Sequence, residues 1–175
     1  MTFVNLQINT DDLPQVVDLE MQPMSPAYIR EVLTQQLIIS AIVLAASFVP
    51  YAFGLGPSAV QSKLLLLPLI ALLVLLSLIP FRLKQARVKA FAIREHDIAY
   101  CSGLIFRKTV LLAFNRVQHI EVTIGPLQKK FGLASLKFFT AGGASVDLAI
   151  DGLKRERAEQ LREFILARSG NRGEI

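Results

Sequence analysis

The chain has 175 residues, of which 53% are hydrophobic and 19% are charged, and its mean hydropathy is +0.47. Because the hydrophobic excess is concentrated between Leu37 and Phe81, the composition indicates lipid-facing segments plus a small domain rather than one large soluble core. The net charge of +5 does not form a nucleic-acid-binding stripe, and the single cysteine, Cys101, excludes an internal disulfide, so neither a nucleic acid partner nor an oxidising compartment is indicated.

Residues 1–24 are expected to form an N-terminal arm on the cytoplasmic side. They contain four acidic residues, no positive charge and no sustained hydrophobic periodicity. A basic segment followed by an early apolar core is absent, so no cleavable signal peptide is predicted. Ser25 and Pro26 then match the N-cap and the first-turn proline of a helix, which we expect to begin here.

Two uncharged apolar runs, LIISAIVLAASFVPYAFG and LLLLPLIALLVLLSLIPF, dominate residues 25–82. Each is close to the length of about 20 residues that a membrane-spanning helix needs, and neither has the polar face of a buried helix in a small soluble domain. The short connection between them contains Gly, Pro and Lys63, so a transmembrane helical hairpin is predicted. Four basic residues follow the second run: Arg82, Lys84, Arg87 and Lys89. The positive-inside rule therefore places both termini in the cytoplasm.

From Val88 the hydrophobic pattern changes to a period of two, which indicates short strands. The expected strands are VKAFAI, DIAYCSG, LIFRKTVLLAF, QHIEVTI, ASLKFFTA and ASVDLAI. The closing segment DGLKRERAEQLREFILAR is expected to be an amphipathic helix with an apolar stripe of Leu153, Ala158, Leu161, Phe164 and Ile165. These elements predict an α+β fold: the hairpin, a cytoplasmic domain over residues 88–170 whose antiparallel sandwich or barrel is closed by the last helix, and a tail over residues 171–175.

The strand QHIEVTI contains residues that could be taken for a metal site. Its alternation places Ile120, Val122 and Ile124 on the core face and His119, Glu121 and Thr123 on the other. His119 and Glu121 would lie about 7 Å apart on one face. Two ligands are too few for a metal, and neither the other histidine nor the cysteine has a partner at ligand spacing. We therefore expect no metal or cofactor, and hydrogen bonding at a solvated or interfacial face.

The next stretch, GPLQKKFG, is predicted to form one or two helical turns that begin at Pro126 and stop before Gly132. Its lysines, Lys129 and Lys130, would remain outside. The stretch lacks the Gly-Lys-Ser/Thr ending of a phosphate-binding Walker loop, and the following TAGG is predicted to be a hairpin turn. Because no nucleophile, base and oxyanion-binding group come together in this pattern, the chain is not expected to be an enzyme.

The segment NRVQHIEVTIGPLQKKFGLASLKFFTAGG resembles the most characteristic part of the bacterial PH-like domains found in YdbS-like membrane proteins. The shared features are an Arg-hydrophobic-Gln-His run, a Gly-Pro-Leu turn, Phe-Gly-Leu-Ala and Thr-Ala-Gly, and the order of parts agrees over nearly the whole chain. The resemblance implies a PH-like fold, two packed antiparallel sheets capped by the C-terminal helix, at the cytoplasmic face of a bacterial inner membrane. Asp151 departs from the family pattern, in which proline is expected at this position.

The resemblance also bears on partners and activity. It implies no catalytic residues, contact with membrane lipids through the hairpin, and a partner that is either a larger membrane protein with repeated PH-like domains or a second copy of the chain. PH-like domains bind lipid headgroups, peptides or proteins, so the fold alone does not choose among these. The first strand-to-strand loop, REHD, is mixed in charge, which argues against phosphoinositide binding of the kind seen in classical members.

Three pairs of residues are candidates for partner or lipid binding. They are Arg107 and Lys108 on one strand, His119 and Glu121 on another, and Lys129 and Lys130 on the short helix. From these observations we expect a membrane-anchored binding or scaffolding module of a membrane complex. An anionic-lipid sensor at the cytoplasmic face is the alternative, since each basic residue near such a surface contributes about 1 kcal/mol of attraction. Solvated lysines that only set the topology are a further alternative.

Overall fold

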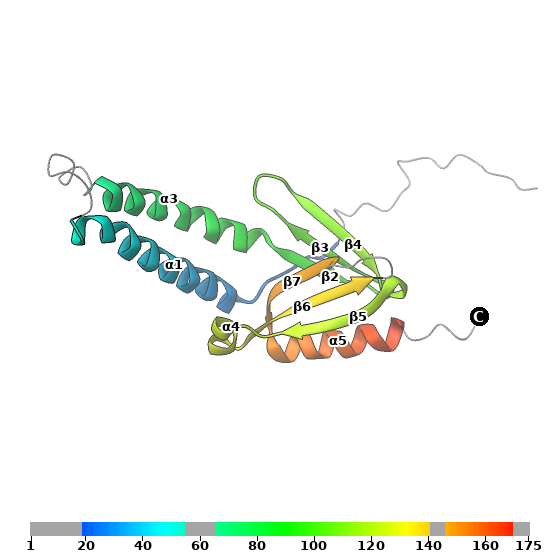
Figure 1. Cartoon of the computed structure of the whole chain (residues 1–175). Helices are drawn as coiled ribbons and strands as arrows, with labels where there is room; N and C mark the ends of the chain where they lie inside the picture. Colours follow the sequence, from blue (N-terminus) through cyan, green and yellow to red (C-terminus); the bar gives the residue numbers. More distant parts are fainter. Residues whose placement is uncertain (1–18, 55–65, 141–145, 170–175) are drawn as a thin grey trace, which may run out of the picture.

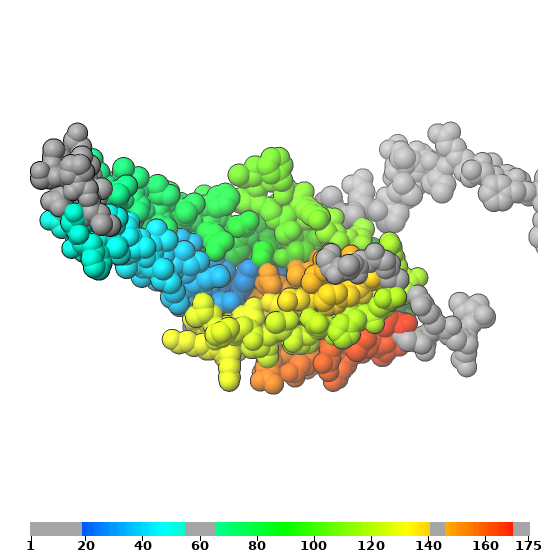
Figure 2. Space-filling model, viewed as in Figure 1, coloured from blue at the N-terminus to red at the C-terminus, as the bar shows by residue number. Residues whose placement is uncertain are grey.

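The computed structural model describes residues 19–54, 66–140 and 146–169. A helical hairpin leaves one side of a β-sheet domain, and a C-terminal helix packs across that domain (Figure 1, Figure 2). Four predicted segments lie wholly or largely outside the described residues: the N-terminal arm, the connection with Lys63, the TAGG turn and the tail after residue 170.

Helices α1 (Pro26–Ala52) and α3 (Leu66–Val88) form the predicted hairpin. The Ser25 hydroxyl caps α1 by accepting a hydrogen bond from the Ala27 amide at 3.3 Å, and Pro26 occupies the first turn, as predicted. Both helices are long and apolar enough to cross a bilayer, and large apolar side chains are exposed along both. Exposed apolar area costs about 25 cal/mol per Å² in water, so this surface is suited to lipid.

The β-sheet domain contains two antiparallel sheets. The first has four strands in the order β1 (Gln22–Pro23), β2 (Ala90–Ile93), β3 (Asp97–Ser102) and β4 (Lys108–Ala113). A short 3-10 helix, η3 (Phe114–Arg116), leads to the second sheet, whose order is β5 (Val117–Thr123), β6 (Leu133–Thr140) and β7 (Leu148–Lys154). Helix α4 (Pro126–Phe131) connects β5 to β6, and α5 (Arg155–Ser169) closes the domain. The predicted α+β architecture is confirmed.

Strand β1 was not predicted. It lies before the hairpin in the chain and pairs with β2, which follows the hairpin, through Gln22 opposite Phe91 and Pro23 opposite Ala90. Two residues are too short to show a period of two in the sequence, so this pairing has no recognisable pattern. As a result the chain enters and leaves the hairpin from neighbouring strands of one sheet.

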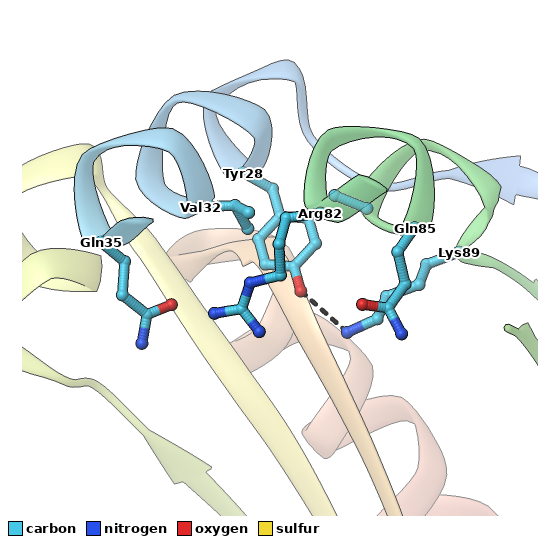
Figure 3. A pocket seen from close by; sticks show the side chains of 7 residues that line it. Tyr28, Val32, Gln35, Arg82, Gln85 and Lys89 are labelled. Carbon is cyan, nitrogen blue, oxygen red and sulfur yellow. Dashed lines mark hydrogen bonds between the residues drawn. The ribbon is translucent and has the colours of Figure 1, made fainter. Parts of the chain in front are cut away.

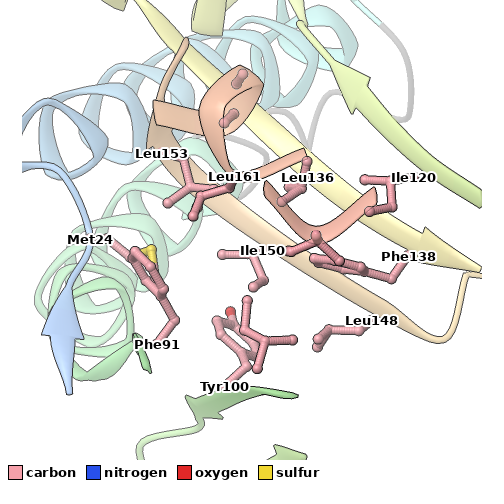
Figure 4. Packing of buried hydrophobic residues seen from close by; sticks show 14 of the residues in the cluster. Met24, Phe91, Tyr100, Ile120, Leu136, Phe138, Leu148, Ile150, Leu153 and Leu161 are labelled. Atoms are coloured by element: carbon pink, nitrogen blue, oxygen red, sulfur yellow. The ribbon is translucent and has the colours of Figure 1, made fainter. Parts of the chain in front are cut away.

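One hydrophobic core extends between the sheets and α5 (Figure 4). Its largest fully buried side chains are Phe114, Phe138, Ile98, Leu133, Leu136, Ile150 and Ile165. The same core contains residues at the base of the hairpin, namely Met24, Tyr28, Val32 and Ala86. The first turns of α1 and the last turn of α3 therefore pack into the domain, and the hairpin is not attached to it by a free linker.

The C-terminal helix begins later than the charge pattern predicts. Residues 151–154 complete β7, where Leu153 pairs with Ala134 of β6, and α5 starts only at Arg155. Residues 151–154 fit both a helical stripe and a strand. They form a strand because pairing with β6 gives hydrogen-bond partners to backbone groups that would otherwise be buried without them. The core stripe of α5 itself is confirmed by the buried side chains of Ala158, Leu161 and Ile165, whereas Phe164 is 36% exposed.

The core face of β5 is shorter than predicted. Ile120 is buried and Val122 is half-buried against the core, but Ile124 is 37% exposed. The strand ends at Thr123, so Ile124 lies beyond the ladder in the turn that leads to α4. The alternation of apolar residues continues past Thr123, the last residue paired with β6. The core face that it predicts is therefore longer than the one that is buried.

The phase of β5 can be tested with two adjacent substitutions. Ile120 is 5% exposed, so Ile120→Asp would place an unpaired carboxylate in the core and should lower the free energy of unfolding by about 3 to 5 kcal/mol. The neighbouring His119 side chain is 65% exposed, and His119→Ala should change stability by no more than about 0.5 kcal/mol. Chemical denaturation in detergent micelles, followed by circular dichroism, measures both. Equal losses would show that the assigned strand phase is wrong.

Candidate site at the base of the hairpin

The first turn of α1 lies directly against β7 at Gly152. The Ser25 amide donates a hydrogen bond to the Gly152 carbonyl oxygen at 3.1 Å. Gly152 has φ of +77°, and a Cβ atom at this position would lie only 2.4 Å from Cγ of Tyr28. Glycine is therefore needed twice here, for the left-handed backbone and for the space that the Tyr28 ring occupies.

Lys89 follows α3 directly and connects three elements at this place. Its ammonium group donates a hydrogen bond to the Tyr28 hydroxyl at 2.8 Å (Figure 3). The same group lies 3.5 Å from the Asp151 carboxylate. Burial opposes the charged form of Lys89, but the hydrogen bond to Tyr28 and the electrostatic effects of Tyr28, Tyr100 and Asp151 outweigh it, so the pKa of Lys89 is raised. Lys89 is therefore charged at neutral pH and links α1, the end of α3 and β7.

Asp151 extends this arrangement to α4. Its second carboxylate oxygen accepts a hydrogen bond from the Ser135 hydroxyl at 2.8 Å, and that hydroxyl accepts one from the Gln128 side-chain amide at 2.8 Å. Gln128 in turn accepts a hydrogen bond from the Gly125 amide at the start of α4. We call Tyr28, Lys89, Asp151, Ser135 and Gln128 the joint network. It connects the base of the hairpin to β6, β7 and α4.

Sequence reasoning did not find the joint network. Its members come from α1, the residue after α3, β6, β7 and α4, and they are up to 123 positions apart because Tyr28 and Asp151 belong to it. The charge pattern gives no indication that Lys89 has a structural partner, and Asp151 stands out only because it replaces the proline that the family resemblance implies. This replacement of proline by aspartate was the sequence feature that could have indicated the joint network, since a carboxylate that a strand places next to a core needs hydrogen-bond partners.

Two hollows flank the joint network. A cavity of about 90 Å³ between the helices has room for water and is lined by Tyr28, Val32, Gln35, Arg82, Gln85, Ala86 and Lys89 (Figure 3). A more open hollow of about 430 Å³, within the usual size range of small-ligand pockets, lies between α1, α4 and β6. Among the described residues, Arg82 Nε beside the first hollow and Glu31 Oε2 beside the second are buried without a hydrogen-bond partner.

His119 and Glu121 lie where the strand alternation predicted, on the outer face of β5. The imidazole Nε2 is 3.8 Å from the Glu121 carboxylate, and the ring lies beside Phe139 with 5.7 Å between centroids. Glu121 is also opposite Lys137 in the ladder to β6. Among the described residues, no group of three or more His, Cys, Asp or Glu side chains is placed to hold a metal ion.

Lys129 and Lys130 lie on the exposed side of α4, which begins at Pro126 and is capped by Gly132 in the left-handed conformation, as predicted. This helix packs beside the beginning of α1, at the end of the second sheet that lies next to the hairpin (Figure 1). The two lysines therefore point outward next to the place where α1 enters its apolar run.

Arg107 and Lys108 are exposed, but they do not lie on one strand as predicted. Only Lys108 belongs to β4, where it pairs with Ser102 of β3, and Arg107 lies in the turn before it. The strand expected to begin at Leu104 starts four residues later because Gly103 folds the chain back at this point. The six candidate residues thus lie at three separate places, the β3–β4 turn with the first residue of β4, β5, and α4, and do not form one site.

The amino-acid sequence matches a known bacterial family and a transmembrane protein. A family model described as "Bacterial PH domain" matches residues 32–169. The UPF0699 transmembrane protein YdbS of Bacillus subtilis (strain 168) is 34% identical over 135 residues, which cover 75% of this chain and 81% of that protein. A crystal structure of a DUF1696 family protein with a pleckstrin-homology domain, from Shewanella loihica PV-4, is 14% identical with a TM-score of 0.37 and covers 46% of this chain and 70% of its own.

The likeness to a transmembrane protein and the two apolar helices together make this chain a membrane protein. The region matched by the family model begins at Val32, inside α1, and ends at Ser169, the last residue of α5. It thus includes most of α1, all of α3 and every strand of the two sheets except β1. This range agrees with the shared core, in which the hairpin and the sheets are one folded unit.

The contact between Tyr28 and Gly152 can be tested with a pair of glycine substitutions. Gly152→Ala combines an unfavourable backbone conformation with a collision against the Tyr28 ring, and should lower the free energy of unfolding by about 2 to 4 kcal/mol. Gly132→Ala is the matched control, because Gly132 has φ of +65° but no atom within 4 Å of the added Cβ, so only about 1 kcal/mol should be lost. Denaturation in micelles compares them. Equal losses would mean that the close approach contributes nothing.

The joint network can be tested at Lys89. Lys89→Met leaves the Tyr28 hydroxyl and Asp151 without their ammonium partner and should cost about 1 to 3 kcal/mol, toward the lower end because Asp151 is partly exposed. Lys84→Met, an equal loss of charge on the exposed side of α3, should change the free energy of unfolding by no more than about 0.5 kcal/mol.

The pH dependence gives a second test of Lys89. Since the folded pKa of Lys89 is raised, its contribution to stability is complete below the ordinary value of about 10.5 and is lost as the pH rises beyond it. A difference between Lys89→Met and the native chain that grows at alkaline pH would contradict this assignment.

Proposed function

The chain belongs to the bacterial PH domain family, and from this membership we propose that it is a membrane-anchored binding or scaffolding module of a membrane protein complex. The observation that carries the proposal is the shared core of hairpin and domain, reinforced by the joint network. A domain built into its anchor has one orientation relative to the bilayer. Such preorganisation lowers the entropic cost of binding a second membrane protein, which is itself restricted to the same plane.

The partner we propose is another membrane protein that carries the same kind of domain, or a second copy of this chain. The apolar side chains along both helices can contact another hairpin within the bilayer, as Ile42 and Leu73 illustrate with 63% and 61% exposure. The outer face of the β5–β6 pair, with His119, Glu121 and Lys137, can contact another domain outside it. Two such surfaces on one rigid unit favour a partner that also has a spanning part and a domain.

The cytoplasmic face is the side on which we place the domain. Arg82, Lys84, Arg87 and Lys89 follow the second apolar run, whereas Lys63 is the basic residue of the connection between the runs. By the positive-inside rule this distribution favours cytoplasmic termini. Within the part of the chain that the structure describes, the side chains of the joint network hydrogen-bond to one another and link secondary-structure elements. This supports a binding role in preference to an enzymatic one.

A second candidate function is anionic-lipid sensing. It is favoured by the position of Lys129 and Lys130, exposed on α4 beside the start of α1, and by the open hollow between α1, α4 and β6. Each cation near an anionic surface contributes about 1 kcal/mol, and this attraction decreases as salt is raised. In this case the ligand would be a lipid headgroup at the membrane surface and no protein partner would be required.

Co-purification distinguishes the two functions. The full-length chain is purified from native membranes in mild detergent, and the accompanying proteins and lipids are identified by mass spectrometry. Under the scaffold proposal one membrane protein is recovered in stoichiometric amount, and its recovery falls for Lys89→Met, which loosens the joint, but not for Lys84→Met. Enriched anionic lipid without a protein would support the lipid-sensing alternative. Equal recovery of the partner with Lys89→Met would refute the requirement for a fixed orientation.

A further inference from the structure

The β3–β4 turn, residues 103–107, is the most exposed apolar part of the domain. The side chains of Ile105 and Phe106 are 73% and 87% exposed. Outside the hairpin, no other large apolar side chain in the described ranges exceeds the 48% of Leu111. Two adjacent apolar side chains of this size in the β3–β4 turn indicate that they contact something in the assembled protein, because their exposure to water is unfavourable.

The backbone holds this turn in one form. Gly103 has φ of +96°, and a Cβ atom there would lie 1.9 Å from the Phe106 carbonyl oxygen, so the chain folds back tightly on itself. The ladder continues to its edge, with Ser102 opposite Lys108 and Cys101 opposite Thr109. Ile105 and Phe106 are therefore held at the end of the paired strands β3 and β4 and do not lie on a free loop.

The turn points to the side of the domain from which the membrane hairpin leaves (Figure 1). In the space-filling view it projects from the surface beside the C-terminal half of α3, and β3 contacts α3 (Figure 2). In that part of α3 the sequence changes from apolar to basic between Phe81 and Arg82, which is where acyl chains give way to headgroups. The tip is therefore directed toward the lipid–water interface.

The charges around the tip are of one sign. Arg107 and Lys108 follow the apolar pair directly and are exposed, and residues 98–120 contain no Asp or Glu. The neighbouring end of α3 adds the exposed side chains of Lys84 and Arg87. An apolar tip with an aromatic ring, followed by cations, matches the layered chemistry of an anionic membrane surface, with acyl chains within and phosphates above them.

We propose that the β3–β4 turn inserts Ile105 and Phe106 into the interfacial layer of the same membrane that the hairpin spans, with Arg107 and Lys108 bound to lipid phosphates. The hairpin and the turn are then two separate points of contact with the bilayer, and together they set the tilt of the domain. This inference rests on the membrane location and on the turn, and does not depend on which protein the domain binds.

Tryptophan fluorescence tests the proposal directly because the chain contains no tryptophan. Phe106→Trp places a single reporter at the tip of the full-length protein, reconstituted in vesicles of phosphatidylcholine and phosphatidylglycerol. Phe48→Trp on α1 is the control within lipid. Leu166→Trp is the control in water, because Leu166 is 41% exposed near the C-terminal end of α5, which lies away from the hairpin (Figure 1). Both leaflets receive lipid with brominated acyl chains, so the direction of insertion does not affect the result.

We expect Phe106→Trp to emit at shorter wavelength than Leu166→Trp and to be quenched by brominated lipid, as Phe48→Trp is. Emission typical of water without quenching would overturn the proposal. A shift to shorter wavelength without quenching would also overturn it, because a protein surface and not lipid would then cover the turn. Neither result depends on the recovery of a partner in co-purification, so failure here and failure of the scaffold function are distinguishable.

A second arm tests the phosphate contacts. Arg107→Gln with Lys108→Gln, introduced together with Phe106→Trp, should clearly reduce the quenching in vesicles that contain phosphatidylglycerol and leave it nearly unchanged in pure phosphatidylcholine. The same pair of substitutions combined with Phe48→Trp should leave quenching unchanged in both, which controls for the reconstitution. Quenching that is the same with and without the two cations in anionic vesicles would refute the role assigned to Arg107 and Lys108.

Discussion

The close approach of the Tyr28 ring to Gly152 is the contact on which the rest of the structure depends. A side chain on Gly152 would exclude the ring, and α1 could not then begin where Ser25 bonds to β7. Once Tyr28 is in place, its hydroxyl accepts from Lys89, which brings the end of α3 to the same strand. The two helices of the hairpin are therefore positioned by the domain as well as by each other.

This contact changes what the hairpin contributes. A hairpin attached through a flexible linker would keep the domain near the bilayer and allow it to rotate, but a hairpin that shares the core transmits its tilt to the sheets. The short pairing of β1 with β2 has the same effect, because the chain is anchored before α1 and after α3. The surfaces of the domain consequently face the membrane and its neighbours in defined directions.

The parts that sequence reasoning predicted well depend on local patterns. The Ser25 cap and the short helix from Pro126 to Gly132 follow from the residues within one turn, and the structure has them as expected. The parts that it missed depend on pairing with distant residues. Ile124 continues an apolar alternation but lies beyond the ladder, and Leu153 fits a helical stripe but is held in β7 by Ala134. For the candidate binding residues, the exposure and the distribution over three segments were predictable, whereas the position of Arg107 in the turn before β4 was not.

The amino-acid sequence by itself determined that the chain has two membrane-length apolar helices, a series of short strands and a final amphipathic helix, because length, periodicity and capping are properties of neighbouring residues. Only the tertiary structure decided that the hairpin is part of the domain, that Lys89 and Asp151 are structural partners and that Ile105 and Phe106 form a projecting tip. The first two features arise where segments far apart in the chain meet, and the energy of such contacts depends on distances in space that no local pattern encodes. The third depends on which side chains the rest of the fold leaves uncovered.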